Sequence, residues 1–126
     1  MLLDTQMLLW AAFQPARLSP KAVKLISARD TPMSFSWVSL WEVAIKASLG
    51  RADFTVDVRE LLEQLLAHDF TLLPIRVEHL MKVSTLPWVH RDPFDRLLVA
   101  QAMSEKLPLL TADRKLAGYG RAVRVL

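Results

Sequence analysis

The chain has 126 residues, 52% of them hydrophobic, which is enough apolar material to bury the core of one domain spanning 1–126. No stretch of about 18 uncharged apolar residues occurs, so we expect no transmembrane helix, and the start Met1-Leu2-Leu3-Asp4 lacks the basic segment of a secretory signal. The absence of cysteine excludes disulfides and thiolate metal sites and predicts a cytoplasmic protein, while the net charge of +3 suits a polyanionic partner without identifying one.

The first half of the chain begins with a short apolar run that ends at Asp4, which predicts a strand. Helical composition follows until Pro15, and Ser19 and Pro20 have the types expected at the cap and first position of a second helix, which we expect to run to about residue 29. The pattern then predicts a strand at 33–36, a helix at 39–49 closed by a glycine, a helix capped at 55 or 57 and running to 67, and a strand at 70–75.

The second half of the chain is marked by one strong helix start. Asp92 is a capping acid, Pro93 occupies the first helical position, and Asp95 adds an acid in the first turn. A short helix at 77–84 and a loop at 88–91 precede this start. The helix continues to about 106, and a strand at 108–111, a helical turn at 114–117 and a strand at 122–126 follow. Short buried strands separated by helices indicate an α/β fold with a mainly parallel sheet.

Four acids fall where such a sheet carries its ligands, outside the carboxyl ends of the strands. Asp4 ends the first strand, and Asp113 follows the strand at 108–111. Glu42 lies just inside the helix after the second strand, and Asp95 opens the helix that leads to the fourth. Carboxylates packed together stay ionised only if a cation neutralises them, and an all-oxygen set selects Mg²⁺ or Mn²⁺. Because such an ion acidifies water and supports charge on a phosphate, the pattern predicts phosphodiester or phosphoryl-transfer chemistry.

Each acid also has a purely structural interpretation. Asp95 suits the positive end of its helix dipole. Ser39, Glu42 and Lys46 share one helix face, where an exposed polar stripe with an i,i+4 ion pair would explain all three. The remaining acids stand at helix-capping positions: Asp4, Asp92 and Asp113. Taken singly these residues do not decide between the two interpretations, and only their joint placement favours a functional site.

Other side chains carry weaker signals. His90 is interpreted as a surface or supporting group, and the remaining histidines, His68 and His79, as helix-surface residues. Core packing is expected for the tryptophans in apolar stretches, which are Trp10, Trp37 and Trp41, whereas Trp88 lies near the proposed site and could stack on a base. Four basic residues near the acids are candidates for RNA phosphate contacts, although ion pairing would explain them equally well: Lys46, Arg91, Arg96 and Arg114.

Four segments resemble, in order, the motifs of the PIN-domain family. The first is Leu3-Asp4-Thr5, the second spans 36–46 and includes Glu42, and the fourth is Leu109-Leu110-Thr111-Ala112-Asp113-Arg114. The third, which begins His90-Arg91-Asp92-Pro93-Phe94-Asp95-Arg96 and runs to residue 102, has the form seen in one group of VapC-type toxins. It is the most specific of the four, and the motifs together extend over the whole chain.

The resemblance implies a three-layer α/β/α fold with strand order 3-2-1-4-5 and an endoribonuclease that is the toxin of a type II toxin–antitoxin pair. It implies that the catalytic, metal-binding acids are Asp4, Glu42, Asp95 and Asp113. Asp92, Thr111 and Thr5 would support the site, with Thr111 bonded to an acid or to metal-bound water, and with Thr5 standing where the family often has Asn. The implied partners are structured RNA of the tRNA or rRNA class, an antitoxin that inserts a segment into the site, and a second copy of the chain.

Three other functions compete with that of an RNA nuclease. A receiver-type signalling domain would need paired acids after the first strand, but Thr5 follows Asp4, and a phosphoacceptor after the third strand, where the chain has Leu73-Pro74-Ile75. A binding module of the same fold that had lost catalysis would lack one of the four acids, and none is missing. A DNA nuclease of the same fold would be distinguished only by comparing substrates.

Overall fold

The computed structural model describes residues 1–126, and its centre is a five-stranded sheet in the order β3-β2-β1-β4-β5. The strands are β1 (Leu2–Leu3), β2 (Ser34–Ser36), β3 (Thr71–Leu73), β4 (Leu109–Thr111) and β5 (Val123–Val125). All neighbouring strands pair in parallel. This confirms the expected fold. Receiver-type folds place the first strand between the second and third, so the position of β1 between β2 and β4 shows that the receiver alternative is wrong.

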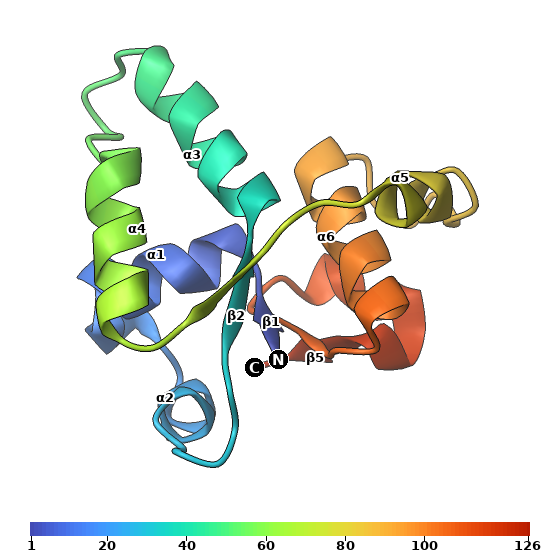
Figure 1. Cartoon of the computed structure of the whole chain (residues 1–126), viewed down its shortest axis with the longest axis horizontal. Helices are drawn as coiled ribbons and strands as arrows, with labels where there is room; N and C mark the ends of the chain where they lie inside the picture. Colours follow the sequence, from blue (N-terminus) through green and yellow to red (C-terminus); the bar gives the residue numbers. More distant parts are fainter.

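Helices cover the sheet on both sides (Figure 1). The α-helices are α1 (Thr5–Phe13), α2 (Pro20–Ile26), α3 (Trp37–Ser48), α4 (Val58–Ala67), α5 (Val77–Val83) and α6 (Pro93–Glu105), and 3-10 segments lie at η1 (Pro15–Arg17) and η2 (Arg114–Ala122). The expected caps are present at Ser19, Asp57 and Asp92, whose side chains each accept a hydrogen bond from a first-turn N–H. None of the helices combines the length and apolar character that a membrane crossing requires.

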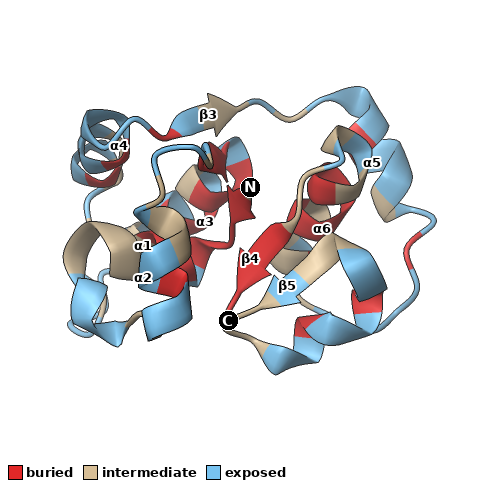
Figure 2. Ribbon diagram, turned by 90° about the horizontal axis from the view of Figure 1, so that it is seen from below, coloured by how far each residue is buried: buried red, intermediate tan, exposed pale blue.

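Alternation along the strands divides the buried side chains into two cores. Successive residues of a strand face opposite sides of the sheet, so Leu3 and Leu110 enter a core shared with α1–α4, whereas Leu2 and Leu109 enter a second core with α6 and η2. Figure 2 shows β4 and the inner faces of the helices coloured as buried, whereas the edge strands β3 and β5 are more accessible. The result is a three-layer arrangement in which the carboxyl ends of the strands remain open along one edge.

Several local expectations are corrected by the structure. The helix expected from Ser39 starts two residues earlier, because the hydroxyl of Ser36 accepts a hydrogen bond from Val38 N at 3.0 Å and caps it. The helix expected to reach residue 29 ends at Ile26. The strand expected at 70–75 is limited to Thr71–Leu73 and is followed by a proline, and the helical turn after Asp113 extends to Ala122 as a kinked 3-10 segment.

The burial of three aromatic residues was also predicted wrongly. Trp37 and Trp41 are 51% and 57% exposed, so α3 turns them away from both cores, and Trp41 packs edge-on against Phe94 with 5.0 Å between ring centroids. His79, expected at the surface, is fully buried. Its Nδ1 accepts a hydrogen bond from Arg76 N, and its Nε2 lies 2.9 Å from Glu105, which ties α5 to α6.

Candidate active site

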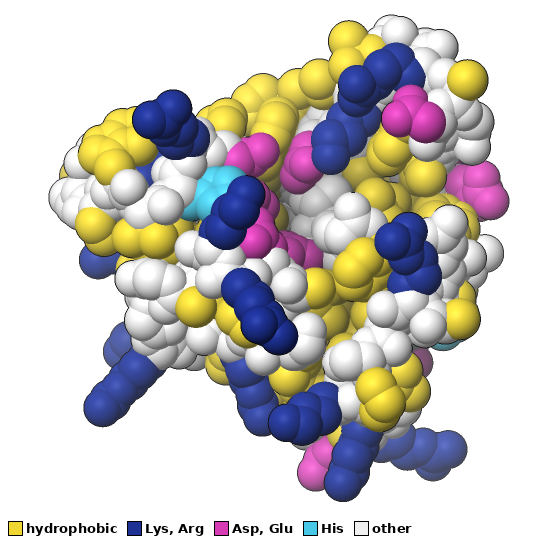
Figure 3. Space-filling view, turned by 180° about the vertical axis from the view of Figure 1, so that it is seen from behind, with side chains coloured by type: hydrophobic (Ala, Val, Ile, Leu, Met, Phe, Trp, Pro, Cys, Tyr) yellow, Lys and Arg dark blue, Asp and Glu magenta, His cyan; other side chains and the backbone are white.

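Acidic side chains from separate parts of the chain gather in one hollow at the carboxyl edge of the sheet (Figure 3). The hollow has a volume of about 300 Å³ and is lined by Asp4, Thr5, Gln6, Leu9, Glu42, Lys46, Asp92, Asp95 and Asp113. All four acids expected to form the site are present in it, as are Thr5 and Asp92. Only one of the lining residues is hydrophobic, so the hollow suits a charged ligand.

Asp4 is held by two hydrogen bonds at the end of β1. Its Oδ1 accepts from Met7 N at 2.9 Å, which caps α1, and its Oδ2 accepts from the hydroxyl of Thr111. The side chain is nonetheless buried, and burial raises the pKa of Asp4 to about 6, with smaller contributions from the charges of Glu42 and Asp113. The two hydrogen bonds, which favour the ionised form, therefore do not offset the free-energy cost of removing the carboxylate from water.

Asp95 and Asp92 open α6 together. Asp92 is the cap, and its Oδ1 accepts a hydrogen bond from Asp95 N at 3.0 Å. The carboxylate of Asp95 accepts no hydrogen bond within 3.5 Å. Burial in the first place, together with the charges of Asp92, Asp4 and the other site acids, raises the pKa of Asp95 to about 7. Without a cation, this carboxyl group is therefore only partly ionised near neutral pH.

Glu42 reaches the hollow from α3. Its Oε2 lies 2.9 Å from Nζ of Lys46, but its Oε1 is buried without any hydrogen-bond partner. The alternative of an exposed polar stripe on this helix is wrong in its exposure, because both Ser39 and Glu42 are buried and the hydroxyl of Thr5 donates to that of Ser39 at 2.9 Å, although the Glu42–Lys46 ion pair that it included is present. A buried carboxylate oxygen without a donor is costly unless a cation binds it.

Asp113 follows β4 and caps the 3-10 segment η2. Its Oδ1 accepts from Lys115 N at 2.9 Å, and its own backbone N–H donates to the Thr111 hydroxyl at 3.0 Å. The same hydroxyl donates to Asp4, so Thr111 links the two strand-end acids. The hydrogen bond expected from Thr111 to an acid is therefore present.

The donor set fits a hard divalent cation. The hollow offers carboxylate oxygens with no cysteine, one of them without a partner on Glu42, and the raised pKa values of Asp4 and Asp95 reflect burial first and the charges of neighbouring acids second. Oxygen ligands of this kind suit Mg²⁺ or Mn²⁺. Residues able to hold the ion are Asp4, Glu42, Asp95 and Asp113.

The basic residues predicted to contact RNA differ in their surroundings. Lys46 lines the hollow, and Arg91 and Arg114 are exposed and form no ion pair within 4.0 Å. Arg96 is 4% exposed and donates hydrogen bonds to the hydroxyl of Tyr119 and to main-chain carbonyls of the loop before α6. The expectation that Arg96 contacts RNA is therefore wrong. Trp88 stacks on its guanidinium at 3.9 Å, so one face of that indole is covered by protein.

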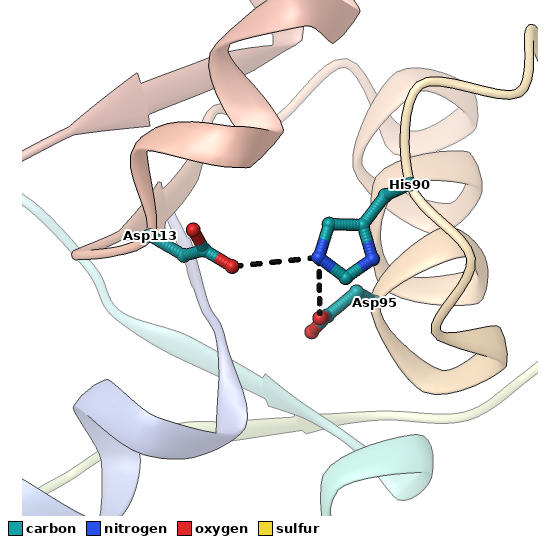
Figure 4. Close-up of side chains that lie close together, drawn as sticks. All are labelled: His90, Asp95 and Asp113. Carbon is teal, nitrogen blue, oxygen red and sulfur yellow. Dashed lines mark ion pairs between the residues drawn. The ribbon is translucent and has the colours of Figure 1, made fainter.

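His90 is the side chain near the acids that sequence reasoning undervalued. Its Nε2 lies 3.5 Å from Oδ2 of Asp113 and 3.9 Å from Oδ2 of Asp95, between the two carboxylates (Figure 4). The imidazole is 17% exposed, so of the two roles expected for His90 the surface role is wrong and the supporting role remains. Its position two residues before the capping Asp92 was the available signal, because the backbone N–H of the cap can donate to the ring of a histidine at that spacing.

This fold and this set of acids define a class of small α/β proteins whose acidic hollow opens at the carboxyl edge of a parallel sheet. The sequence profile of the PIN domain matches residues 1–122, and the chain belongs to the PIN-domain family. It is 31% identical over 121 residues to ribonuclease VapC22 of Mycobacterium tuberculosis, with 94% of this chain and 90% of that protein covered. The expected family is confirmed by this match.

Solved structures support the fold at lower sequence identity. VapBC2 from Rickettsia felis, crystallised with a promoter DNA fragment, matches with a TM-score of 0.73 and 14% identity over 99% of this chain and 96% of that one. A toxin–antitoxin complex from Klebsiella pneumoniae matches with a TM-score of 0.66 and 18% identity over 98% and 95%. VapBC-5 from Mycobacterium tuberculosis matches with a TM-score of 0.61 and 22% identity over 99% and 95%.

Proposed function

We propose that this chain is a metal-dependent endoribonuclease and the toxin of a VapBC-type toxin–antitoxin pair. The observation that carries the proposal is the convergence of Asp4, Glu42, Asp95 and Asp113 on one hollow, with a buried Glu42 oxygen that lacks a partner. The relationship to a ribonuclease supports the activity, and the likeness to VapBC proteins supports the biological role.

The residues of the hollow would have two roles, which are binding the metal ion and positioning the substrate. Mg²⁺ or Mn²⁺ bound there would acidify a water molecule and neutralise charge on the scissile phosphate. Asp4 is fixed by Met7 N and Thr111, whereas the Asp95 carboxylate accepts no hydrogen bond within 3.5 Å, so Asp95 is the acid best suited to accept a proton from the attacking water.

The proposed substrate class is supported by the basic residues at the rim of the hollow. Lys46 beside the hollow and the unpaired Arg91 and Arg114 are available for phosphates that flank the cut. An open, shallow site is best reached by an unpaired loop, where bases and phosphates are splayed apart, so we propose structured RNA of the tRNA or rRNA class. The antitoxin would occupy the same hollow, and the active form would be a cytoplasmic homodimer of the single domain 1–126.

The proposal is tested by cleavage assays on the Asp95→Asn variant. The change removes one charge and breaks no side-chain hydrogen bond of Asp95, so we expect unchanged folding and a loss of cleavage of at least about a hundredfold. Asp53→Asn is the matched control, since Asp53 is exposed and lies outside the hollow. Loop RNA and single-stranded DNA of the same sequence are compared. Full activity of Asp95→Asn would refute the mechanism, and preferential cutting of DNA would replace the proposal with a DNA nuclease.

A further inference from the structure

The loop that carries His90 is fixed on several sides. The backbone N–H of His90 donates to the Tyr119 hydroxyl at 3.1 Å, and the same hydroxyl accepts from Arg96 at 3.1 Å. Arg96 also donates to the carbonyl of Pro87 at 2.9 Å and to that of His90 at 3.5 Å. Because Arg96 is buried and bonded to several carbonyls, the loop cannot shift without leaving these groups unpaired.

The ring of His90 is fixed by a further contact. Its Nδ1 accepts a hydrogen bond from the backbone N–H of Asp92 at 3.1 Å. A neutral imidazole carries a hydrogen on one nitrogen only, and the nitrogen that accepts is the one without it. The hydrogen of the neutral ring is therefore on Nε2, the nitrogen that lies between the carboxylates of Asp95 and Asp113.

We propose that His90 is a positioning residue whose Nε2–H, 3.5 Å from Asp113 Oδ2 and 3.9 Å from Asp95 Oδ2, orients the two carboxylates by electrostatic attraction, and that it stays outside the ligand set of the metal. The inference rests on the proposed function, because it assumes that these acids bind a divalent ion. It differs from the simplest interpretation of the geometry, in which His90, Asp95 and Asp113 lie close enough to hold one ion together.

The tautomer decides between these interpretations. A histidine that binds a metal through Nε2 has its hydrogen on Nδ1 and donates it to an acceptor such as a carbonyl or a carboxylate. Here the partner of Nδ1 is the N–H of Asp92, which is itself a donor, so ligation through Nε2 would place two hydrogens against each other and break the contact. The site is therefore left with oxygen ligands alone, which favours Mg²⁺ or Mn²⁺ over Zn²⁺.

Two variants separate the roles of the two ring nitrogens. His90→Asn retains an acceptor near Nδ1 for the Asp92 N–H but has no donor at Nε2, and His90→Gln retains a donor near Nε2 but loses the acceptor. If the Nε2–H positions the acids, His90→Asn should weaken Mg²⁺ binding by about 10- to 100-fold, whereas His90→Gln should bind close to wild type. A purely structural role of the loop contact predicts the reverse order.

The measurements are Mg²⁺ titration calorimetry of each protein and ¹⁵N–¹H correlation spectra of the histidine rings in the wild type, without metal and with Mg²⁺ or Zn²⁺. We expect Nδ1 of His90 to carry no hydrogen and Nε2 to be free of metal in every spectrum. Ligation of Nε2 by either ion, equal Mg²⁺ affinity in both variants and the wild type, or equal loss in both variants would overturn the inference while leaving the nuclease proposal intact. A wild-type protein that binds neither Mg²⁺ nor Mn²⁺ would overturn both.

Discussion

Replacing Asp4 by asparagine should stabilise the metal-free protein at pH 8. The pKa of Asp4 rises from 3.8 to about 6 on folding, chiefly because the carboxyl group is buried. At about 1.4 kcal/mol per pKa unit this corresponds to about 3 kcal/mol. Between these two pKa values the folded state binds more protons than the unfolded chain, so the free energy of unfolding falls as pH rises. The contribution is complete below about pH 4 and is lost as pH rises through 6.

The substitution Asp4→Asn removes this charge and leaves most of the local structure in place. Asparagine is as good a helix cap as aspartate, so the hydrogen bond from Met7 N should persist. The hydroxyl of Thr111 loses its carboxylate acceptor, at a cost of about 1 kcal/mol. The variant should therefore be more stable than the wild type by about 2 kcal/mol at pH 8 and less stable by about 1 kcal/mol at pH 4.

The assay is urea unfolding followed by tryptophan fluorescence, with EDTA present, at both pH values. At saturating Mg²⁺ the order at pH 8 should reverse, because an ion at 100 times its Kd stabilises the wild type by about 2.7 kcal/mol and the variant by much less. A metal-free variant less stable than the wild type at pH 8 would show that Asp4 is an ordinary helix cap whose ionised carboxylate is well accommodated. The reasoning from burial would then be refuted.

Three further predictions concern the cofactor and the loop before α6. EDTA should abolish RNA cleavage and Mg²⁺ or Mn²⁺ should restore it, whereas chelator-resistant cleavage by pure protein would exclude a metal mechanism. Arg96→Met leaves several buried carbonyls without a donor and should lower the free energy of unfolding by about 3 kcal/mol, measured in urea; a change below about 1 kcal/mol would contradict the role given to Arg96. Gly118→Ala places a Cβ 2.6 Å from a methyl carbon of Val89 and should lower the free energy of unfolding by about 1–3 kcal/mol. The clash should also displace the His90 loop and so shift the ring NMR signals of His90. Unchanged signals would contradict the displacement.

Sequence patterns predicted the fold and the acids because both depend on local signals. Apolar runs, caps and prolines mark the ends of elements, and in a parallel sheet the end of a strand is also the edge where ligands bind. Asp4 and Asp113 could be assigned to that edge for this reason alone, and both line the hollow. The strand order itself came from the family resemblance and not from these patterns.

The errors concern side chains whose surroundings come from distant parts of the chain. Arg96 and Arg91 are alike in sequence, both basic and next to an acid, but helix α6 turns Arg96 into the core, where Tyr119 meets it. His79 is buried because Glu105 lies opposite on α6. Trp37 is exposed because its helix begins earlier than expected and turns it outwards. No local pattern predicts these surroundings. The partners of Arg96 and His79 lie on other elements, and the surroundings of Trp37 depend on where its helix begins.

The structural and functional interpretations of the acids are not alternatives in this fold. Asp4 and Asp113 each use Oδ1 to cap a helical segment, which fixes the carboxylate, and leave Oδ2 available for a second contact. Capping N–H groups favour the ionised form, yet the pKa of Asp4 still rises to about 6, so burial and the neighbouring acids outweigh them. A fold that fixes several carboxylates in this way is under electrostatic strain until a cation binds. Helix capping therefore contributes to the geometry of the hollow, and under the proposed function the unfavourable charge concentrated there would supply the affinity for a divalent ion.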